Sequence, residues 1–530
     1  MPSYRVENFG CRATQADGAA LERQLDACGF SRAFSEQAEL VILNTCTVTS
    51  SADQDARAAI RRVQRENRLA RIVVTGCYAQ RAPGEVAALP GVWLVVGNSH
   101  KHQLAEIVQR NFRDAEKVAA GNETVEPASP GAGASREAHS LLPIANLTEN
   151  WDLRTESWEK RTENPTYVSD IFAHTELLAA PVFESASPIA NQHDRTRPNL
   201  KVQDGCDNRC AFCVIPSVRG HSRSLPLGRV ISEVNMLVAA GYRELVISGI
   251  NLGRWGRDLA DAAQPGSTGR HHGQRLESLI RAILAETQLE KLRISSVEPT
   301  DWSDELIALV ASTPRIAKHA HVPLQSGSDA VLRRMHRKYR PWHYREKIET
   351  IRAAMPAAAI GADVMVGFPG ESDLEFEATR SLIADLPFTY LHVFTYSARP
   401  GTPAASMPNQ IPPQIARQRS KILRDLAVEK KKTFMQSFFG RKLDAITLNV
   451  VHERPDGQFT EALTDNYQKT YIKGRHTPNR WLTVRVDAIE DGAFLSTHAE
   501  IIDPLKSVAD RRDRVRAPAH QDSPGVAAVL

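Results

Sequence analysis

The feature that most restricts the fold is an alternation of strand and helix patterns that repeats six times between residue 200 and about residue 398. Such alternation is typical of parallel βαβ construction. Six units fit an incomplete barrel better than a complete eightfold one. We therefore predict an α/β fold with a partial (β/α)6 barrel over residues 191–430. The predicted strands, all short and apolar, are 200–205, 244–250, 291–297, 318–325, 359–368 and 390–397.

Polar residues and glycines cluster directly after these predicted strands. The first cluster carries Cys206, Cys210 and Cys213, and Glu298 and Gln325 stand at the ends of the third and fourth strands. In α/β barrels the active site lies at the carboxyl ends of the strands. We therefore expect all five residues to line one mouth, with Glu298 and Gln325 as candidate contacts for a cofactor or substrate.

The rest of the sequence predicts a reducing environment for these thiols. The amino terminus has no apolar run long enough for a signal peptide, and no later stretch approaches the roughly 18 apolar residues of a membrane span. We therefore expect a cytoplasmic protein without a membrane partner, in which disulfides are rare. The seven cysteines are then better explained as metal ligands or core residues.

Three closely spaced thiols leave more than one kind of site open. A structural zinc ion normally takes four ligands, and His221 is a candidate fourth, but no second CxxC pair lies nearby. Unligated core thiols are less favoured, because the loop GCDNRCAFC contains glycine and charged residues. A four-iron cluster held by three thiolates keeps one iron open to a small molecule. We favour this iron–sulfur cluster.

The CxxxCxxC spacing after the first strand of a six-unit barrel resembles the radical S-adenosylmethionine enzymes, in which an aromatic residue such as Phe212 also precedes the last cysteine. The resemblance implies a [4Fe-4S] cluster whose open iron chelates S-adenosylmethionine and delivers an electron that cleaves it to a 5′-deoxyadenosyl radical. An unidentified electron donor is then a required partner. Ser248 and Gly249 match the position at which such enzymes bring backbone close to the methionine moiety, and a plain tight turn is the alternative.

A second α/β unit is predicted over residues 1–115. A helical stretch lies between β-branched runs that are typical of buried parallel strands, which gives a Rossmann-like βαβ pattern. The helical stretch is 52–68, and the runs are 38–48, 70–80 and 92–98.

Three cysteines of this unit, Cys11, Cys46 and Cys77, each follow a predicted strand, whereas Cys28 lies in an amphipathic segment and is expected in the core. The carboxyl ends of parallel strands share one edge of a sheet, so the three thiols could meet there. They could then hold a second four-iron cluster. The alternative is three separate core cysteines.

Composition changes mark the other boundaries. Residues 116–190 hold few large apolar side chains, so we expect a partly disordered linker, and 504–530 are expected to form a disordered tail. A basic helix at 414–432 leads into segments that alternate apolar and polar residues. These segments predict a small antiparallel β-barrel over residues 431–503.

The segments NTCTV and GCYAQR, around Cys46 and Cys77, resemble the amino-terminal domain of the methylthiotransferases. That family combines an amino-terminal cluster domain, a radical S-adenosylmethionine core and a small β-barrel named TRAM in this order, and all three are predicted here. The resemblance implies two [4Fe-4S] clusters. The one on Cys11, Cys46 and Cys77 would present sulfur that a second S-adenosylmethionine methylates.

The family has branches that modify isopentenyladenosine in tRNA, threonylcarbamoyladenosine in tRNA, or an aspartate of a ribosomal protein. The segments HVPLQSGSDAVLRRMHRKY and VMVGFPGESDLEF are most similar to the threonylcarbamoyladenosine branch. We therefore expect a methylthio group to be added to the adenine of N6-threonylcarbamoyladenosine next to the anticodon in tRNA. The other two branches are the alternatives, and a non-catalytic metal-containing RNA-binding protein is the alternative from another class.

A tRNA anticodon loop as partner requires cations that neutralise phosphates and aromatic rings on which bases can stack. Tyr467 and Tyr471 are interleaved with basic residues of the predicted C-terminal barrel, whereas Trp481 is expected in its core. Arg219 and Arg223 are candidates for contact with a phosphate or a carboxylate. The candidate RNA-binding residues are Lys430, Lys431, Lys432, Lys473 and Arg475.

Overall fold

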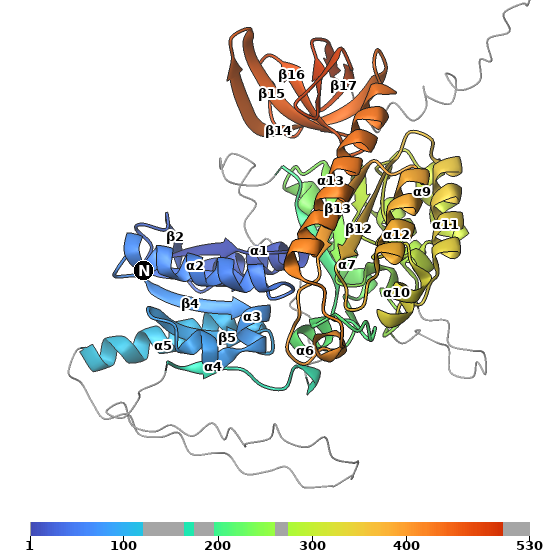
Figure 1. Cartoon of the computed structure of the whole chain (residues 1–530). Coiled ribbons are helices and arrows are strands. Elements are labelled where there is room, and N and C mark those ends of the chain that lie inside the picture. The colour runs from blue at the N-terminus through green and yellow to red at the C-terminus, as the bar shows by residue number, and fades with distance from the viewer. Residues whose placement is uncertain (1, 120–163, 174–195, 260–273, 502–530) are drawn as a thin grey trace, which may run out of the picture.

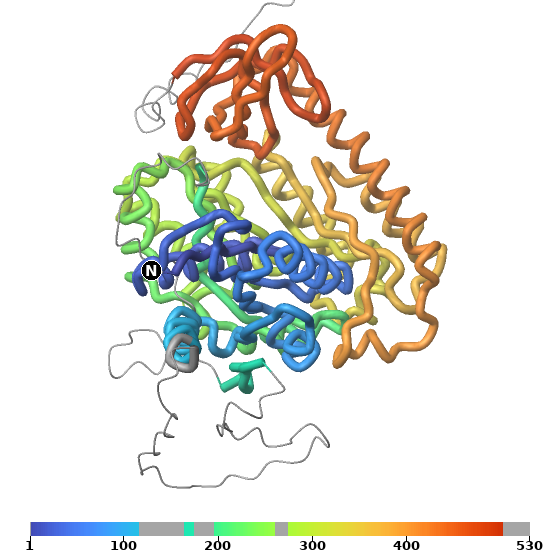
Figure 2. Tube along the Cα trace, turned by 90° about the vertical axis from the view of Figure 1, so that its left-hand side faces the viewer, coloured from blue at the N-terminus to red at the C-terminus, as the bar shows by residue number. Residues whose placement is uncertain are grey.

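The computed structural model describes residues 2–119, 164–173, 196–259 and 274–501. In chain order it forms an N-terminal α/β domain, an α/β barrel and a C-terminal β-sheet domain (Figure 1). The N-terminal domain lies against one side of the barrel and the C-terminal domain lies beyond one end of it, as the rotated view also shows (Figure 2). The predicted tail and most of the predicted linker lie outside the described residues.

The N-terminal domain is built on one parallel sheet with the strand order β2-β1-β3-β4-β5-β6. Its central strands are almost wholly buried because helices cover both faces. Leu40 and Ile42 pack in one core cluster, and Val41 and Leu43 pack in the other, on the opposite face. This arrangement confirms the predicted Rossmann-like domain. The elements are β1 Ser3–Asn8, α1 Arg12–Ala27, β2 Ser31–Arg32, β3 Leu40–Thr45, α2 Ser50–Glu66, β4 Arg71–Gly76, α3 Cys77–Arg81, α4 Pro83–Ala87, β5 Val92–Gly97, η1 Lys101–Gln103 and α5 Leu104–Ala119.

The edge strand β6 (Thr166–Tyr167) and the short helix η3 (Ile171–Ala173) come from within the segment predicted as a linker. β6 pairs in parallel with β5 through Val95 and Val96. The carbonyl oxygen of Ile171 lies so close to Gly220 of the barrel that an added Cβ would approach it to 2.7 Å. Residues 164–173 therefore complete the sheet and touch the barrel. The sequence analysis did not predict this edge strand, because the strand is very short and the segment around it has few apolar residues.

The barrel contains the six predicted parallel strands. β7 pairs with β9, β9 with β10, β11 with β12, and β12 with β13, while single bridges connect the region of β10 to that of β11. No pairing among the described residues joins β7 to β13, so the barrel is open, as predicted. The strands are β7 Asn199–Asp204, β9 Glu244–Gly249, β10 Lys291–Ile294, β11 His319–His321, β12 Ala359–Val366 and β13 Tyr390–Thr395, with a short antiparallel β8 Arg223–Ser224 beside β7.

Helices cover the outside of the barrel and leave its inner side polar. Along β12, Ile360, Ala362 and Val364 alternate outward into the main core, whereas Asp363 and Met365 point to the opposite side and stay less buried. The period-2 geometry of a strand produces this division. The helices are α6 Ile215–Arg219, α7 Leu227–Ala239, η4 Leu252–Arg254, α8 Leu276–Glu286, η5 Pro299–Asp301, α9 Asp304–Ser312, α10 Asp329–Arg334, α11 Pro341–Ala354, α12 Asp373–Asp385 and η6 Pro403–Ser406.

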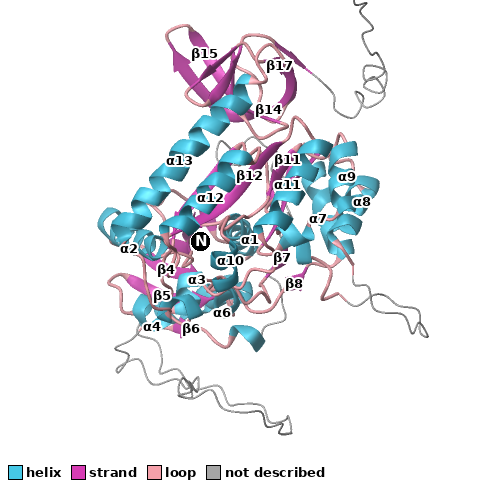
Figure 3. Ribbon diagram, turned by 45° about the vertical axis from the view of Figure 1, so that its right-hand side comes forward, coloured by secondary structure: helices cyan, strands magenta, loops and turns pink. Residues whose placement is uncertain are grey.

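The long helix α13 (Pro413–Gln436) runs along the barrel and ends at the C-terminal domain (Figure 3). That domain is one sheet with the order β18-β19-β16-β15-β14-β17-β20, antiparallel except where β16 pairs with β19. Trp481 is buried in it, as predicted. No described helix has the length and apolar composition needed to cross a bilayer. The strands are β14 Lys442–Arg454, β15 Gly457–Thr464, β16 Lys469–Lys473, β17 Trp481–Arg485, β18 Ala488–Glu490, β19 Ala493–Ser496 and β20 Ala499–Ile501.

Candidate active site

The cysteines of the N-terminal domain meet at one edge of its sheet. Cys11 caps α1 after β1, Cys46 follows β3, and Cys77 begins α3 after β4, and these three strands are neighbours in the sheet. Gly10, with φ at +113°, carries the chain so close over Cys46 that an added Cβ would lie 2.5 Å from its Cβ. Burial raises the pKa of the Cys46 thiol to about 12, and the nearby thiols of Cys77 and Cys11 add to this effect.

The cysteines of the barrel lie on the loop after β7. Gly205 adopts a φ of +69°, and an added Cβ there would clash with the carbonyl of His221 at 1.8 Å, so glycine is required. Burial raises the pKa of the Cys213 thiol to about 12 and also raises that of Cys206. His221, the candidate fourth zinc ligand, is exposed and lies 2.8 Å from Asp207 through its Nδ1.

The sulfur atoms of both triads have hydrogen-bond donors beside them. The amide of Asn98 donates to Cys77 Sγ at 3.5 Å. The backbone N–H of Asn208 donates to Cys206 Sγ at 3.4 Å. Arg337 donates to Cys210 Sγ at 3.2 Å. Thiolate sulfur attracts such donors, and buried thiols of raised pKa lose their protons only when a metal takes them as ligands. Both donor sets therefore fit iron–sulfur ligation.

The two triads approach each other at the contact between the domains. Cys77 shares one buried apolar cluster with Val214, Ile215 and Val218 of the barrel, and Cys206 and Cys213 pack against the same cluster. Asn98 bridges the contact, because it also donates to the carbonyl of Val218 at 2.7 Å. Cys77 of one triad and Cys206 and Cys213 of the other therefore lie against the same small apolar patch.

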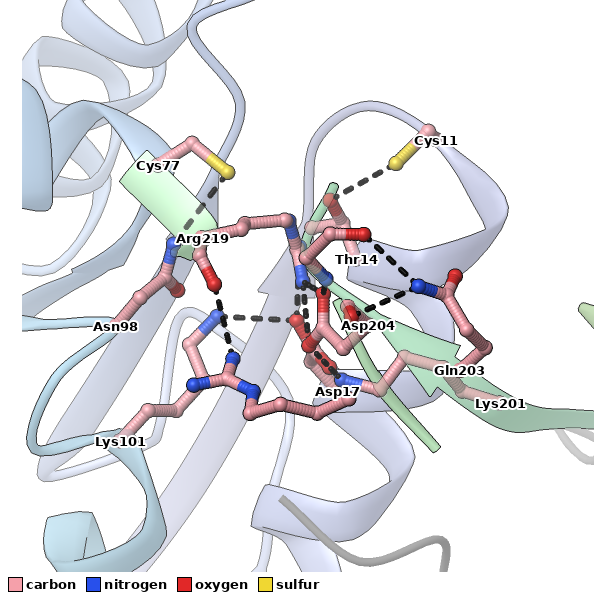
Figure 4. A network of polar contacts seen from close by, with 12 residues as sticks. Cys11, Thr14, Asp17, Cys77, Asn98, Lys101, Lys201, Gln203, Asp204 and Arg219 are labelled. Atoms are coloured by element: carbon pink, nitrogen blue, oxygen red, sulfur yellow. Dashed lines mark hydrogen bonds and ion pairs between the residues drawn. The ribbon is translucent and has the colours of Figure 1, made fainter. Parts of the chain in front are cut away.

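A buried charge network joins the two domains beside this patch (Figure 4). Asp17 of α1 accepts hydrogen bonds from Lys101 at 3.2 Å, from Arg219 at 3.0 Å and from Lys201. Asp204 at the end of β7 accepts from Lys201 at 2.6 Å and Arg219 at 2.9 Å. All five side chains are buried. We call this set the interdomain charge network.

Arg219, a candidate for contact with a phosphate or a carboxylate, lies within this network. The carboxylates that it contacts are Asp17 and Asp204 of the chain itself. Burial alone would raise the pKa of Asp17, but Lys101, Lys201 and Arg219 together hold it well below its ordinary value. Arg223, the other candidate, donates to the carbonyl of Arg219 at 2.9 Å and supports the same turn. Neither arginine is therefore included in a surface for phosphate.

Two further contacts hold the domains together. Arg399 of the barrel donates to the buried Asp53 and, at 2.9 Å, to Thr47, both in the N-terminal domain. At the other contact, Arg12 donates to the hydroxyl of Tyr467 at 3.1 Å, so the residue after Cys11 reaches the C-terminal domain. Tyr467, with φ at +64°, packs its ring 4.6 Å from that of His319.

The inner side of the barrel carries polar residues of which the sequence analysis singled out Glu298 but not its neighbours. Glu298 pairs with Arg337, which links it to Cys210. Burial raises the pKa of Glu298 in spite of this partner. The neighbouring strands β11, β12 and β13 bring His321, Asp363 and His392 together, with Asp363 Oδ1 3.1 Å from His321 Nε2 and 3.2 Å from His392 Nδ1. The segments that hold these residues were recognised, but nothing local marks the individual side chains.

The other predicted mouth residues lie at strand ends. Ser248 and Gly249 end β9, and Ser248 is buried. The space beside Gly249 is filled from within the chain, because an added Cβ would lie 2.8 Å from Gln203 Oε1. Gln325, with φ at +63°, bridges to β12 through backbone hydrogen bonds with Asp363 and Met365.

The predicted RNA-binding lysines divide into two groups. Lys430 donates to the carbonyls of Ala384 and Leu386 at 2.7 and 2.8 Å, and Lys431 donates to that of Gly492 at 2.8 Å. These two ammonium groups bind the chain itself, and burial lowers the pKa of both. Lys432, Lys473 and Arg475 are exposed, the latter two around the loop between β16 and β17.

A cysteine triad on the loop after the first strand of an open six-stranded parallel barrel defines a radical S-adenosylmethionine enzyme. Residues 200–383 match the Radical SAM superfamily, and residues 3–97 match the uncharacterized protein family UPF0004. The chain is 31% identical over 475 residues to the threonylcarbamoyladenosine tRNA methylthiotransferase of Bacillus subtilis, and the match covers 89% of this chain and 91% of that protein. The chain therefore belongs to the methylthiotransferase family.

A second relative agrees with this assignment. The tRNA-2-methylthio-N(6)-dimethylallyladenosine synthase of Novosphingobium aromaticivorans is 32% identical over 447 residues, which cover 84% of this chain and 86% of that protein. The solved structure of the radical S-adenosylmethionine methyltransferase TsrM from Kitasatospora setae is similar with a TM-score of 0.47 and 16% identity, over 76% of each chain. Family membership identifies a transferase of sulfur-containing groups and sets aside a non-catalytic RNA-binding protein.

Proposed function

We propose that this enzyme adds a methylthio group to the adenine of N6-threonylcarbamoyladenosine next to the anticodon of tRNA. The observation that carries the proposal is that Cys77 of the N-terminal triad shares one apolar patch with Cys206 and Cys213 of the barrel triad. The name of the Bacillus subtilis relative supplies the modified nucleoside. A side-chain acid or base cannot easily remove the hydrogen of an aromatic C–H bond. A cofactor must therefore supply the reactivity.

Cys206, Cys210 and Cys213 would hold a [4Fe-4S] cluster and S-adenosylmethionine, and Cys11, Cys46 and Cys77 would hold a second cluster. A bound pair of clusters would supply the electron that cleaves S-adenosylmethionine and the sulfur that is transferred. The chain buries Cys46 and Cys77, half-buries the three barrel cysteines and leaves Cys11 exposed. Asn98, Asn208 and Arg337 donate hydrogen bonds to the sulfur atoms of Cys77, Cys206 and Cys210, respectively. Ser248, Gly249, Glu298 and Gln325 are proposed to contact S-adenosylmethionine or the base. Ser248 and Gly249 end β9, and Glu298 and Gln325 lie in the segments that follow β10 and β11.

Mass spectrometry of tRNA nucleosides tests the proposal. Reconstituted enzyme, S-adenosylmethionine and a strong reductant are incubated with tRNA that carries threonylcarbamoyladenosine or isopentenyladenosine. We expect a mass gain of one methylthio group on threonylcarbamoyladenosine. A gain confined to isopentenyladenosine would assign the enzyme to the other tRNA branch. A gain on neither nucleoside, together with modification of a ribosomal-protein aspartate, would contradict a tRNA substrate.

Arg337 is predicted to position both the loop of the barrel triad and Glu298. An Arg337→Met variant removes the donor to Cys210 Sγ and leaves Glu298 buried without its partner. Because donors to metal ligands are typically worth about 10- to 100-fold in affinity or activity, we expect 5′-deoxyadenosine formation to fall by about that factor. Arg333→Met, at an exposed arginine that pairs only with Asp329, is the matched control. An unchanged rate in Arg337→Met would contradict the assignment.

Lys473 and Arg475 are predicted to bind tRNA phosphates. The double variant Lys473→Gln/Arg475→Gln should weaken tRNA binding and lower the slope of log affinity against log salt by about 1.5. Its yield of 5′-deoxyadenosine without tRNA should equal that of the parent. Lys347→Gln on the outer helix α11, where Lys347 pairs with Asp304, should leave both affinity and slope unchanged. An unaltered salt slope in the double variant would remove this loop from the RNA surface.

A further inference from the structure

The interdomain charge network carries an excess of positive charge inside the protein. It contains three cations, Lys101, Lys201 and Arg219, and two carboxylates, Asp17 and Asp204. Each of the five side chains is at least nine-tenths buried. Three cations against two anions leave one positive charge without a partner inside the network. Because this charge is buried, water and salt screen it poorly. It therefore interacts strongly with other charges nearby.

Three residues of the network, Asp17, Lys101 and Arg219, lie close to a cysteine of the N-terminal triad or to its neighbours. Asp17 lies on α1 one turn after Thr14, whose hydroxyl is 3.5 Å from Cys11 Sγ. Lys101 donates at 3.0 Å to Asn44, which lies two residues before Cys46. Arg219 follows Val218, which packs against Cys77.

The electrostatics agree with this placement. Arg219 interacts favourably with Cys77 and Cys11, and Lys101 interacts favourably with Cys77. Figure 4 shows the guanidinium of Arg219 between the two carboxylates and the thiols of Cys11 and Cys77. The network therefore lies beside the N-terminal triad.

We propose that the interdomain charge network sets the reduction potential of the cluster held by Cys11, Cys46 and Cys77, and that docking of the N-terminal domain on the barrel completes it. The inference rests on the proposed second cluster. Adding an electron makes a thiolate-held cluster more negative, and a buried cation nearby favours that step. Asp17 and Lys101 come from the N-terminal domain and balance each other, whereas Lys201, Asp204 and Arg219 come from the barrel and carry the excess cation, so docking brings that charge to the N-terminal triad.

The test uses the full chain in the background Cys206→Ala/Cys210→Ala/Cys213→Ala, which leaves only the N-terminal cluster. Its midpoint potential is measured by a redox titration that is followed by electron paramagnetic resonance. Lys101→Met removes a cation at nearly constant volume and should shift the potential to more negative values. Asp204→Asn removes a carboxylate and should shift it to more positive values. Arg399→Met breaks the separate buried contact with Asp53 and should leave the potential unchanged.

Opposite shifts in Lys101→Met and Asp204→Asn, at unchanged iron content, would support the inference. Equal potentials in these two variants and the background would overturn it. Shifts of one sign in all three variants, Arg399→Met included, would also overturn it, because loosened docking rather than charge would then be the cause. If the background itself binds no iron and shows no cluster spectrum, the proposed second cluster fails first. Iron content and visible spectrum therefore separate the two failures.

Discussion

Replacement of Cys206 by alanine is expected to abolish 5′-deoxyadenosine formation while the protein keeps half of its iron. Cys206 is one of three thiols on the loop after β7, and its sulfur accepts hydrogen bonds from Asn208 at 3.4 Å and Asn251 at 3.6 Å. A cluster deprived of one of its three ligands is not retained at this loop. Iron should fall from about eight to about four atoms per chain, and the cleavage rate should fall by at least roughly a thousandfold, as when a catalytic group is removed.

Cys28→Ala provides the matched control. Cys28 packs at the border of the N-terminal core, away from both triads, and burial raises the pKa of its thiol. This variant should keep both the iron and the rate of the parent. Iron by colorimetric assay and 5′-deoxyadenosine by mass spectrometry are the two measurements. A Cys206→Ala protein that still cleaved S-adenosylmethionine after reduction would refute the division of labour between the triads.

Asp17→Asn is expected to cause the largest loss of stability among single substitutions at the domain contact. The asparagine keeps the shape of Asp17 but leaves Lys101, Lys201 and Arg219 with Asp204 as their one carboxylate in the network. Removal of one partner from a buried ion pair typically costs about 3–5 kcal/mol. The first melting transition should fall by roughly 10 °C. Asp373→Asn, at an almost fully exposed carboxylate paired with Arg419, should change it little.

The same network predicts a dependence of stability on pH. The folded-state pKa values of Asp17 and Asp204 are lowered, because the surrounding cations outweigh the effect of burial. Their contribution is therefore present above the unfolded pKa of about 3.9 and is lost as the pH falls through the lower folded values. Melting temperatures of the parent should fall below about pH 4 more steeply than those of Asp17→Asn. Parallel curves for the two proteins would contradict this assignment.

The local pattern of apolar residues was sufficient to predict the main strands. The run around Leu40 is apolar on both sides of the strand because helices bury both faces of the sheet. Along β12, Ile360 and the residues that alternate with it on the outward face are apolar, whereas the inner face carries Asp363. The strands β15 and β16 were predicted only as part of the C-terminal barrel and not as individual segments, because polar residues such as Thr460, Thr464 and Thr470 occupy buried positions in them. β6 was missed because two residues cannot show a periodicity.

The cysteines were found from the sequence because their spacing and their place after strands carry chemical information. Their surroundings could not be found in this way. Lys101 and Arg219 lie 84 and 202 residues from Asp17, and Arg337 lies 127 residues from Cys210. Such partners meet only when the chain folds, and Arg219 reaches Asp17 only when the two domains dock. In the sequence alone, each of these residues is indistinguishable from an ordinary surface residue. The cysteines could therefore be recognised from their local sequence, whereas the residues that surround them in the structure come from distant parts of the chain.

The turn at Tyr467 limits how the C-terminal domain can be exchanged between enzymes. Its hydroxyl accepts from Arg12, its ring packs on His319, and Arg293 lies over it with 5.4 Å between guanidinium carbon and ring centroid. A domain transplanted from another enzyme would need an aromatic residue in the same left-handed conformation to keep these three contacts. Chimeras that exchange RNA preference should therefore be joined on the barrel side of Tyr467 and should carry a compatible turn. Without that turn, the transplanted C-terminal domain would lie at a different angle to the catalytic mouth.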